Sequence, residues 1–244
     1  LAKGLARAKR TIGYVKDAGA DVAKFQAMRM EIYPAGYRAE GFDQPLDEFV
    51  APYEVPDGWW PILKEECDRV GIEFMCSVFL PEDVALIDPL VKRHKIASFE
   101  LGHTELLETV AATEKPLLIS TGASSRINIQ KALRTLNHGR ERATNPYPAT
   151  VLHCISSYPA LPKNMNMLAL EDLQYETGCD KGFSDHTCGK CLTAAVVAVA
   201  FRADVIEKHV TEHHNLGSPD AHFAADPEEC QRYVAAIREA EQML

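Results

Sequence analysis

The sequence has no apolar run long enough to form a membrane span, because a spanning helix needs about 20 apolar residues and the longest run covers only residues 192–201. It also lacks the excess of positive charge that a nucleic-acid surface requires, since 26 Lys and Arg stand against 35 Asp and Glu. Its seven scattered cysteines do not form the dense framework of a small secreted domain. We therefore expect a cytoplasmic protein that binds neither membrane nor nucleic acid, although a local basic pocket for a small anion is compatible with its net charge of −9.

No linker, low-complexity tract or internal repeat divides the chain, and short β-rich runs alternate with longer segments of helical periodicity. The predicted strands are residues 21–26, 73–78, 94–98, 117–121, 150–155, 182–186 and 204–210. The predicted helices are residues 1–18, 60–70, 83–92, 104–113, 128–136, 191–201 and 227–244. This alternation predicts a parallel sheet with right-handed crossovers in a single α/β domain over residues 1–244.

The predicted strands are one fewer than a (β/α)8 TIM barrel contains, and a helix precedes the first of them. We expect this barrel, with its first strand missing from the sequence. An open doubly wound sheet is the competing fold. It would bring a Gly-rich phosphate loop after an early strand, and the sequence has no such loop.

Charged and hydrogen-bonding residues lie within or just after nearly every predicted strand, where a buried strand should be apolar. These residues are Lys24, Gln26, Lys95, Ser98, Glu100, Ser120, Thr121, Gly122, His153, Ser156, Tyr158, Ser184, Asp185, His186, Glu207, Lys208 and His209. Taken singly, each has a structural explanation, such as a snorkelling Lys24 or a hydrogen-bonded core His153. Because the carboxyl ends of barrel strands converge, their repetition predicts one site at that end.

The chemistry of this set suits a phosphate or a phosphate ester. Lys24 and Lys95 supply positive charge, and Gly122 allows backbone N–H groups to approach a ligand closely. The hydroxyl donors are Ser98, Ser120, Ser156 and Ser184. Ammonium groups that neutralise charge, with short donors that complete the shell, are typical of phosphate recognition.

His186 and His209 end the last two predicted strands, which we expect to be neighbours about 4.8 Å apart. Two imidazoles in that position suit a divalent metal, while general acid–base work and a structural role are the alternatives. Glu100 and Glu207 are candidate proton-transfer or hydroxyl-binding groups. The CxxC motif at residues 188–191 has no second pair, so we expect it to be incidental.

Six segments, in their order along the chain, resemble the motifs of N-acetylneuraminate (sialic acid) synthases and of their relatives, the legionaminic and pseudaminic acid synthases and a spore-coat polysaccharide protein. They are AGADVAKFQ at 18–26, KIASFE at 95–100, STG at 120–122, HCISSYP at 153–159, FSDHT at 183–187 and EKHVT at 207–211. The resemblance implies a barrel enzyme of carbohydrate biosynthesis. Such a transferase condenses phosphoenolpyruvate with the open-chain aldehyde of a 2-acetamido sugar, such as N-acetylmannosamine, and releases phosphate.

The same resemblance assigns roles to individual residues. Phosphoenolpyruvate would contact Lys95, Ser98, Ser120, Gly122, Ser156 and Ser184, with Lys24 assisting. The sugar would contact Gln26, Glu100, Tyr158 and Asp220, with Glu207 near the reacting centre. His186 and His209 would ligate a divalent metal, typically Mn²⁺, with Mg²⁺ or Co²⁺ as alternatives. The family's C-terminal antifreeze-like domain is absent from this sequence, and the resemblance is compatible with a homodimer.

Two alternatives to this function stay open at the level of sequence. One is another synthase that condenses phosphoenolpyruvate with an aldose, of the 3-deoxy-octulosonate phosphate type. The other is a non-catalytic sugar-binding or spore-coat assembly protein on the same barrel. The pairing of the SDHT and EKH segments favours the first interpretation, because the octulosonate group lacks it.

Overall fold

A computed structural model describes residues 2–32, 35–38, 45–138 and 147–244. Seven parallel strands form one sheet whose spatial order follows the sequence, β1 to β7. The strands are β1 (Val22–Gln26), β2 (Glu73–Val78), β3 (His94–Ile96), β4 (Leu117–Ser120), β5 (Ala149–Cys154), β6 (Asp180–Asp185) and β7 (Val205–Lys208). All seven predicted strands are therefore confirmed, although β3 and β7 each end two residues earlier than expected.

Seven of the described helices were predicted. They are α1 (Ala2–Asp17), α3 (Trp59–Val70), α4 (Pro81–Ile87), α5 (Thr104–Ala111), α6 (Arg126–Leu136), α8 (Thr193–Ala200) and α9 (Pro227–Glu241). Their ends agree with the prediction to within three residues, except that α4 ends at Ile87 and not at residue 92. Two helices were not predicted, α2 (Leu46–Val50) and α7 (Ala169–Thr177). Their apolar pattern is short, since α7 buries only Leu170 and Leu173. In the described ranges, no helix has both the length and the apolar character needed to cross a membrane.

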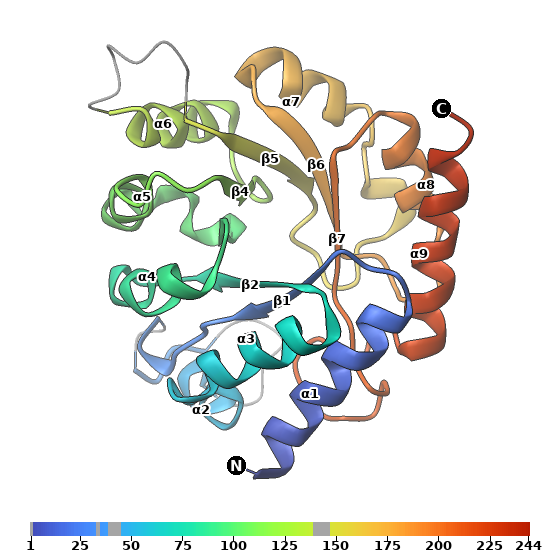
Figure 1. The fold of residues 1–244 in the computed structure, drawn as a ribbon. Helices are drawn as coiled ribbons and strands as arrows, with labels where there is room; N and C mark the ends of the chain where they lie inside the picture. The colour runs from blue at the N-terminus through green and yellow to red at the C-terminus, as the bar shows by residue number, and fades with distance from the viewer. Residues whose placement is uncertain (1, 33–34, 39–44, 139–146) are drawn as a thin grey trace.

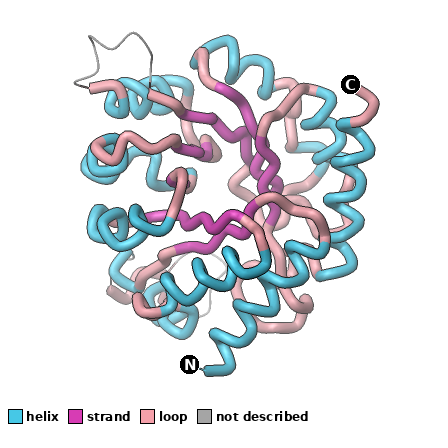
Figure 2. Tube along the Cα trace, viewed as in Figure 1, coloured by secondary structure: helices cyan, strands magenta, loops and turns pink. Residues whose placement is uncertain are grey.

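The sheet curls around a central axis, with the helices on its outer side (Figures 1 and 2). Helix α1 packs against both α3 and α9, so it lies across the side where β1 and β7 face each other. Among the described strands, β1 pairs only with β2 and β7 only with β6. The structure is therefore a curled, half-barrel α/β fold, and the eighth strand of a closed barrel stays a prediction.

The alternation of side chains along each strand separates two cores. Outward-facing residues such as Phe74, Ile96 and Val151 pack against the helices in one large cluster. Inside the curl, an apolar floor is formed by Val22, Met75, Leu118, Leu152 and Val205. Gly182 belongs to this layer because a Cβ there would lie 2.3 Å from the Leu152 side chain and 2.7 Å from the Val205 carbonyl oxygen.

Candidate active site

Polar side chains line the inner face of the sheet directly above the apolar floor. Because side chains alternate with a period of two, residues two positions beyond the floor also point inward, nearer the carboxyl ends of the strands. These residues are Lys24, Ser77, Ser120, Cys154, Ser184 and Glu207, with Lys95 paired to Ser77 in the β2–β3 register. The predicted convergence of polar strand ends is thus built by the register of the sheet.

The Glu207 carboxylate lies at the centre of this layer, between two lysines. Its Oε2 is 3.5 Å from Lys24 Nζ, and its Oε1 is 3.9 Å from Lys95 Nζ. Ser184 donates a hydrogen bond of 2.8 Å to Oε1. Burial alone would raise the pKa of Glu207, but the charges of Lys24 and Lys95 outweigh it and hold this pKa far below its usual range. Glu207 is therefore an anion held by two cations.

Lys95 is almost completely buried, with 2% of its surface exposed. Its ammonium group donates hydrogen bonds to Ser120 Oγ (2.8 Å) and to the Ile96 carbonyl oxygen (3.0 Å). Burial lowers the pKa of Lys95, and the negative charge of Glu207 opposes that effect. A buried ammonium with one carboxylate nearby suits an anionic ligand that brings further negative charge.

Short donors lie beside these lysines around Gly122. The Gly122 N–H donates to Ser98 Oγ (3.1 Å), and Ser98 Oγ lies 3.1 Å from Cys154 Sγ. A Cβ at Gly122 would lie 2.5 Å from both Ser156 Oγ and Cys154 Sγ, so only glycine fits here. Ser156 Oγ is buried and has no hydrogen-bond partner among the residues that the structure describes. A buried hydroxyl left unpaired is costly unless a ligand completes it.

Glu100, like Ser156, has a buried polar atom that lacks a hydrogen bond from any described residue, and it lies near the carboxyl ends of the strands. It lies in the short 3₁₀ helix η4 (Ser98–Gly102), which follows β3. Its Oε2 is buried and finds no hydrogen-bond partner within the described part of the chain, and burial raises the pKa of its carboxyl group. A carboxyl group in this state suits hydrogen bonding to hydroxyl or amide groups of a bound molecule.

His186 and His209 are brought together just beyond the ends of β6 and β7, with ring centroids 5.4 Å apart. His186 Nδ1 lies 2.8 Å from the Ile155 carbonyl oxygen, and His209 Nδ1 lies 3.3 Å from Asp220 Oδ2. Because both partners are acceptors, each Nδ1 carries a hydrogen, and in the neutral form of either ring the lone pair lies on Nε2. Imidazoles oriented in this way by a carbonyl and a carboxylate are the usual donors to a divalent metal, so the residues fit such an ion.

The surroundings of His186 keep this imidazole in the neutral form that binds a metal. Burial, and next the neighbouring His209, lower the pKa of His186 from 6.5 to about 4, so His186 is neutral at neutral pH. The Tyr158 ring lies 4.4 Å from His186, and the Phe223 ring lies 5.3 Å from His209. Hydrogen bonding to His209 lowers the pKa of Asp220 against the opposing effect of burial, which keeps this carboxylate charged.

The structure links the lysine layer to the imidazole pair through short contacts. Lys24 contacts Glu207, Glu207 contacts Ser184, and Ser184 Oγ lies 3.5 Å from His186 Nε2.

Gln26 ends β1 beside Ser77 and is half-buried. Three residues that the sequence analysis did not select join the site: Ser77 (3.5 Å from Lys24 Nζ), Cys154 and Phe223. The period of two along β2 could have identified Ser77.

Not every polar strand residue takes part in the site. His153 faces outward, where its Nε2 lies 2.7 Å from the Met165 carbonyl oxygen and its ring stacks on Phe183. His153 is therefore a hydrogen-bonded core residue, as the structural explanation of this residue predicted. Asp185 and Lys208 also face outward, toward α9.

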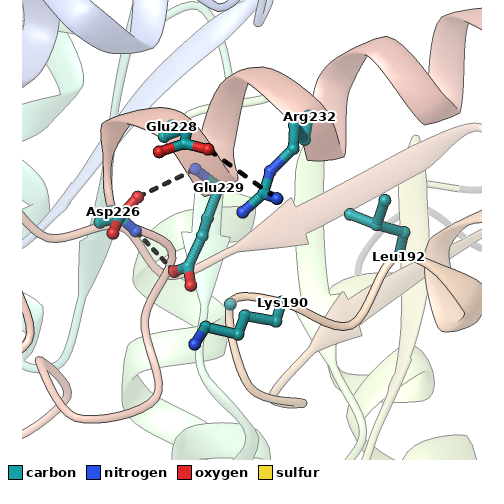
Figure 3. A pocket seen from close by; sticks show the side chains of 7 residues that line it. Lys190, Leu192, Asp226, Glu228, Glu229 and Arg232 are labelled. Atoms are coloured by element: carbon teal, nitrogen blue, oxygen red, sulfur yellow. Dashed lines mark hydrogen bonds and ion pairs between the residues drawn. The ribbon is translucent and has the colours of Figure 1, made fainter.

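A separate cavity of about 450 Å³ lies at the start of α9, and its lining includes none of the predicted site residues. Figure 3 shows the side chains that line it. Asp226 and Glu229 form the capping box of this helix, with reciprocal hydrogen bonds of 2.9 and 3.1 Å. His214 Nε2 lies 3.2 Å from Glu229 Oε2, and these three residues are the one metal-like trio found in the described part of the chain. The carboxylates of Asp226 and Glu229 are explained by their capping of helix α9, without a metal ion.

The sequence matches the NeuB family over residues 11–244. The chain belongs to the NeuB family. It is 37% identical over 243 residues to an uncharacterized protein of Methanocaldococcus jannaschii, covering 97% of this chain and 66% of that protein. It is 32% identical over 246 residues to N,N'-diacetyllegionaminic acid synthase of Legionella pneumophila, covering 97% of this chain and 68% of the relative. The chain thus spans about two thirds of the length of these relatives.

The fold agrees with the family. A crystal structure of N-acetylneuraminic acid (sialic acid) synthetase from Leptospira borgpetersenii, in complex with citrate, superposes on the chain with a TM-score of 0.86 at 28% identity. The match covers 98% of this chain and 80% of that one. The predicted resemblance to a family of synthases is therefore confirmed for this NeuB-family domain.

Proposed function

We propose that this NeuB-family domain condenses phosphoenolpyruvate with the open-chain form of a 2-acetamido sugar, giving a nonulosonic acid and phosphate. The observation that carries the proposal is the contact path from Lys24 through Glu207 and Ser184 to His186. It joins a buried cationic layer, suited to a phosphorylated anion, to an imidazole pair suited to a metal. The names of relatives, which include a legionaminic acid synthase and a sialic acid synthetase, support the same reaction class.

Lys24, Lys95 and Glu207 together carry a net charge of +1, two lysines against one carboxylate, so this layer favours an anion. In the proposed complex, Lys95 and Lys24 neutralise the phosphoenolpyruvate charges. Hydrogen bonds to the phosphoryl and carboxylate oxygens come from Ser98, Ser120, Gly122, Ser156 and Ser184. Apart from Ser156, these groups already make hydrogen bonds in the free domain, which lowers the entropic cost of fixing the reacting enol.

Glu207 is proposed to act on the proton of the water that adds at the reacting carbon. In the free domain its pKa is held down because Lys24 and Lys95 stabilise the carboxylate. A bound phosphate competes for those two ammonium groups, so the pKa of Glu207 rises toward its ordinary value and the carboxylate becomes a better base. Phosphoenolpyruvate binding would in this way activate the group that the next step needs.

The sugar is proposed to bind at the carboxyl ends of the strands, where Gln26, Glu100, Tyr158 and Asp220 supply hydrogen-bonding groups. His186 and His209 would hold a divalent ion, Mn²⁺ in our proposal, with Mg²⁺ and Co²⁺ as alternatives. Such an ion would supply Lewis-acid polarisation of the aldehyde oxygen. The closed eight-stranded barrel, the homodimer and the cytoplasmic location remain predictions.

The proposal is tested by measuring phosphate release from phosphoenolpyruvate with a panel of 2-acetamido aldoses, with and without Mn²⁺, using the intact protein. We expect metal-dependent release with at least one of them and none from the His209→Ala variant. Release with phosphorylated aldoses alone would favour the octulosonate phosphate class instead. A protein that binds neither Mn²⁺ nor phosphoenolpyruvate in calorimetry would be a non-catalytic scaffold, and the proposal would be wrong.

A further inference from the structure

Behind the imidazole pair, on the outer face of the sheet, lies a buried network that the proposed reaction does not use. Asp185 and Lys208 directly precede His186 and His209 in the sequence and point to the opposite face. They also face each other as the last register pair of the β6–β7 ladder. Asp185 is completely buried, and the Lys208 side chain is 6% exposed.

The network joins both strands to helix α9. Lys208 Nζ lies 3.3 Å from Asp185 Oδ2, and the Tyr233 hydroxyl donates a hydrogen bond of 2.7 Å to the same oxygen. The Thr187 N–H donates to Asp185 Oδ1 (2.8 Å), while Lys208 donates to the Thr187 carbonyl oxygen and hydroxyl. The Lys208 ammonium also lies 5.4 Å from the centre of the Tyr233 ring. Both Asp185 oxygens and the Lys208 ammonium are therefore fully engaged.

The location of this network, at the end of the β6–β7 pairing, is what connects it to the imidazole pair. The regular β6–β7 ladder stops at Asp185 and Lys208, so the segments that carry the two imidazoles are no longer paired to each other. Each is held by a different neighbour, since the His209 carbonyl oxygen accepts a hydrogen bond from the Ala225 N–H (2.8 Å) and the His186 carbonyl oxygen accepts one from the Ala160 N–H (2.8 Å). The outer network continues across that end, since Thr187 flanks His186 on the other side and is tied to Lys208. A change in the Asp185–Lys208 contact would therefore alter the separation of the imidazoles, now 5.4 Å between centroids.

We propose that Asp185, Lys208 and Tyr233 are positioning residues that set the spacing of His186 and His209 for a divalent metal. This inference rests on the proposed function, because it assumes that the imidazole pair binds an ion. It assigns no contact with substrate to the three residues. Replacing these three residues should change the affinity for the metal. The residues proposed to bind phosphoenolpyruvate lie on the inner face of the sheet and are positioned by other contacts.

The test measures the Mn²⁺ dissociation constant of the intact protein by calorimetry and by the paramagnetic resonance of free Mn²⁺. Groups hydrogen-bonded directly to metal ligands typically change affinity by 10- to 100-fold. Lys208 acts one contact further away, so we expect Lys208→Met to raise the dissociation constant by about tenfold, the lower end of that range. Tyr233→Phe, which removes one hydrogen bond and keeps the ring, should give a smaller rise. Lys208→Arg, which keeps the charge, should recover part of the loss. Phosphoenolpyruvate affinity without metal should stay within about threefold of wild type in each variant, since its ligands lie on the inner face.

A matched control is Arg93→Met, which removes the ion pair between Arg93 and Glu73 (2.9 Å) at the amino end of β2. It should lower stability without changing Mn²⁺ affinity. If Lys208→Met fails to fold, Tyr233→Phe and Lys208→Arg carry the test. Normal Mn²⁺ binding in these folded variants overturns the positioning role alone. A wild-type protein that binds no divalent ion overturns the proposed metal site, and this inference with it.

Discussion

Replacing Lys95 by Met tests the assignment of the buried cationic layer. The substitution keeps a long apolar stem but removes the ammonium group that contacts Ser120 Oγ at 2.8 Å and Glu207 at 3.9 Å. A hydrogen bond to a charged group contributes about 1.5–3 kcal/mol. We therefore expect the dissociation constant for phosphoenolpyruvate to rise by about 10- to 150-fold. The KM for the sugar should change by less than about threefold, because its proposed contacts lie beyond this layer.

The effect of Lys95→Met on stability should be small by comparison. Lys24 and Ser184 remain to stabilise the Glu207 carboxylate, and burial already disfavours the Lys95 charge. We expect unfolding by urea to show a loss of about 1–2 kcal/mol, less than for a buried ion pair left with no remaining partner.

Calorimetry with phosphoenolpyruvate in the absence of sugar separates the two effects of Lys95→Met. The matched control is Lys181→Met, which removes a buried lysine near the start of β6 and should leave phosphoenolpyruvate affinity unchanged. Equal losses for phosphoenolpyruvate and sugar would mean that Lys95 is misassigned. Unchanged phosphoenolpyruvate binding would refute the argument that the buried ammonium recognises an anion.

The other predictions concern the imidazole pair and the apolar floor. His209→Ala should abolish Mn²⁺-dependent phosphate release while circular dichroism stays native, and release by the variant that Mn²⁺ stimulates as much as in wild type would contradict the role. Because the pKa of His186 is lowered from 6.5 to about 4, the stability it contributes is complete above pH 6.5 and falls by about 3 kcal/mol as the pH drops to 4. The gap in unfolding free energy between wild type and His186→Asn should therefore change by that amount, and a constant gap across this range would refute it. Gly182→Ala should cost about 1–3 kcal/mol by overpacking, measured by urea unfolding, whereas Gly13→Ala, which has open space around it in α1, should not destabilise.

The order of strands and helices could be read from the amino-acid sequence alone, because apolar periodicity and turn residues are local signals. All seven strands follow from it, whereas α7 does not, since a nine-residue helix that buries only Leu170 and Leu173 leaves little pattern to read. The ordered motifs also led to the family. Sequence reasoning selected Lys24, Lys95, His186 and His209 because charged groups on buried strands need a partner or a ligand.

Which polar residues share a site depends on the three-dimensional fold. A period of two tells that Glu207 and Lys208 face opposite ways, but both faces of a buried parallel sheet are covered, so the pattern does not say which is inside. The curl of the sheet puts Glu207 between lysines from β1 and β3, and it turns His153 and Lys208 toward the helices. The contacts that orient the imidazoles likewise come from segments distant in the chain, which no local signal encodes.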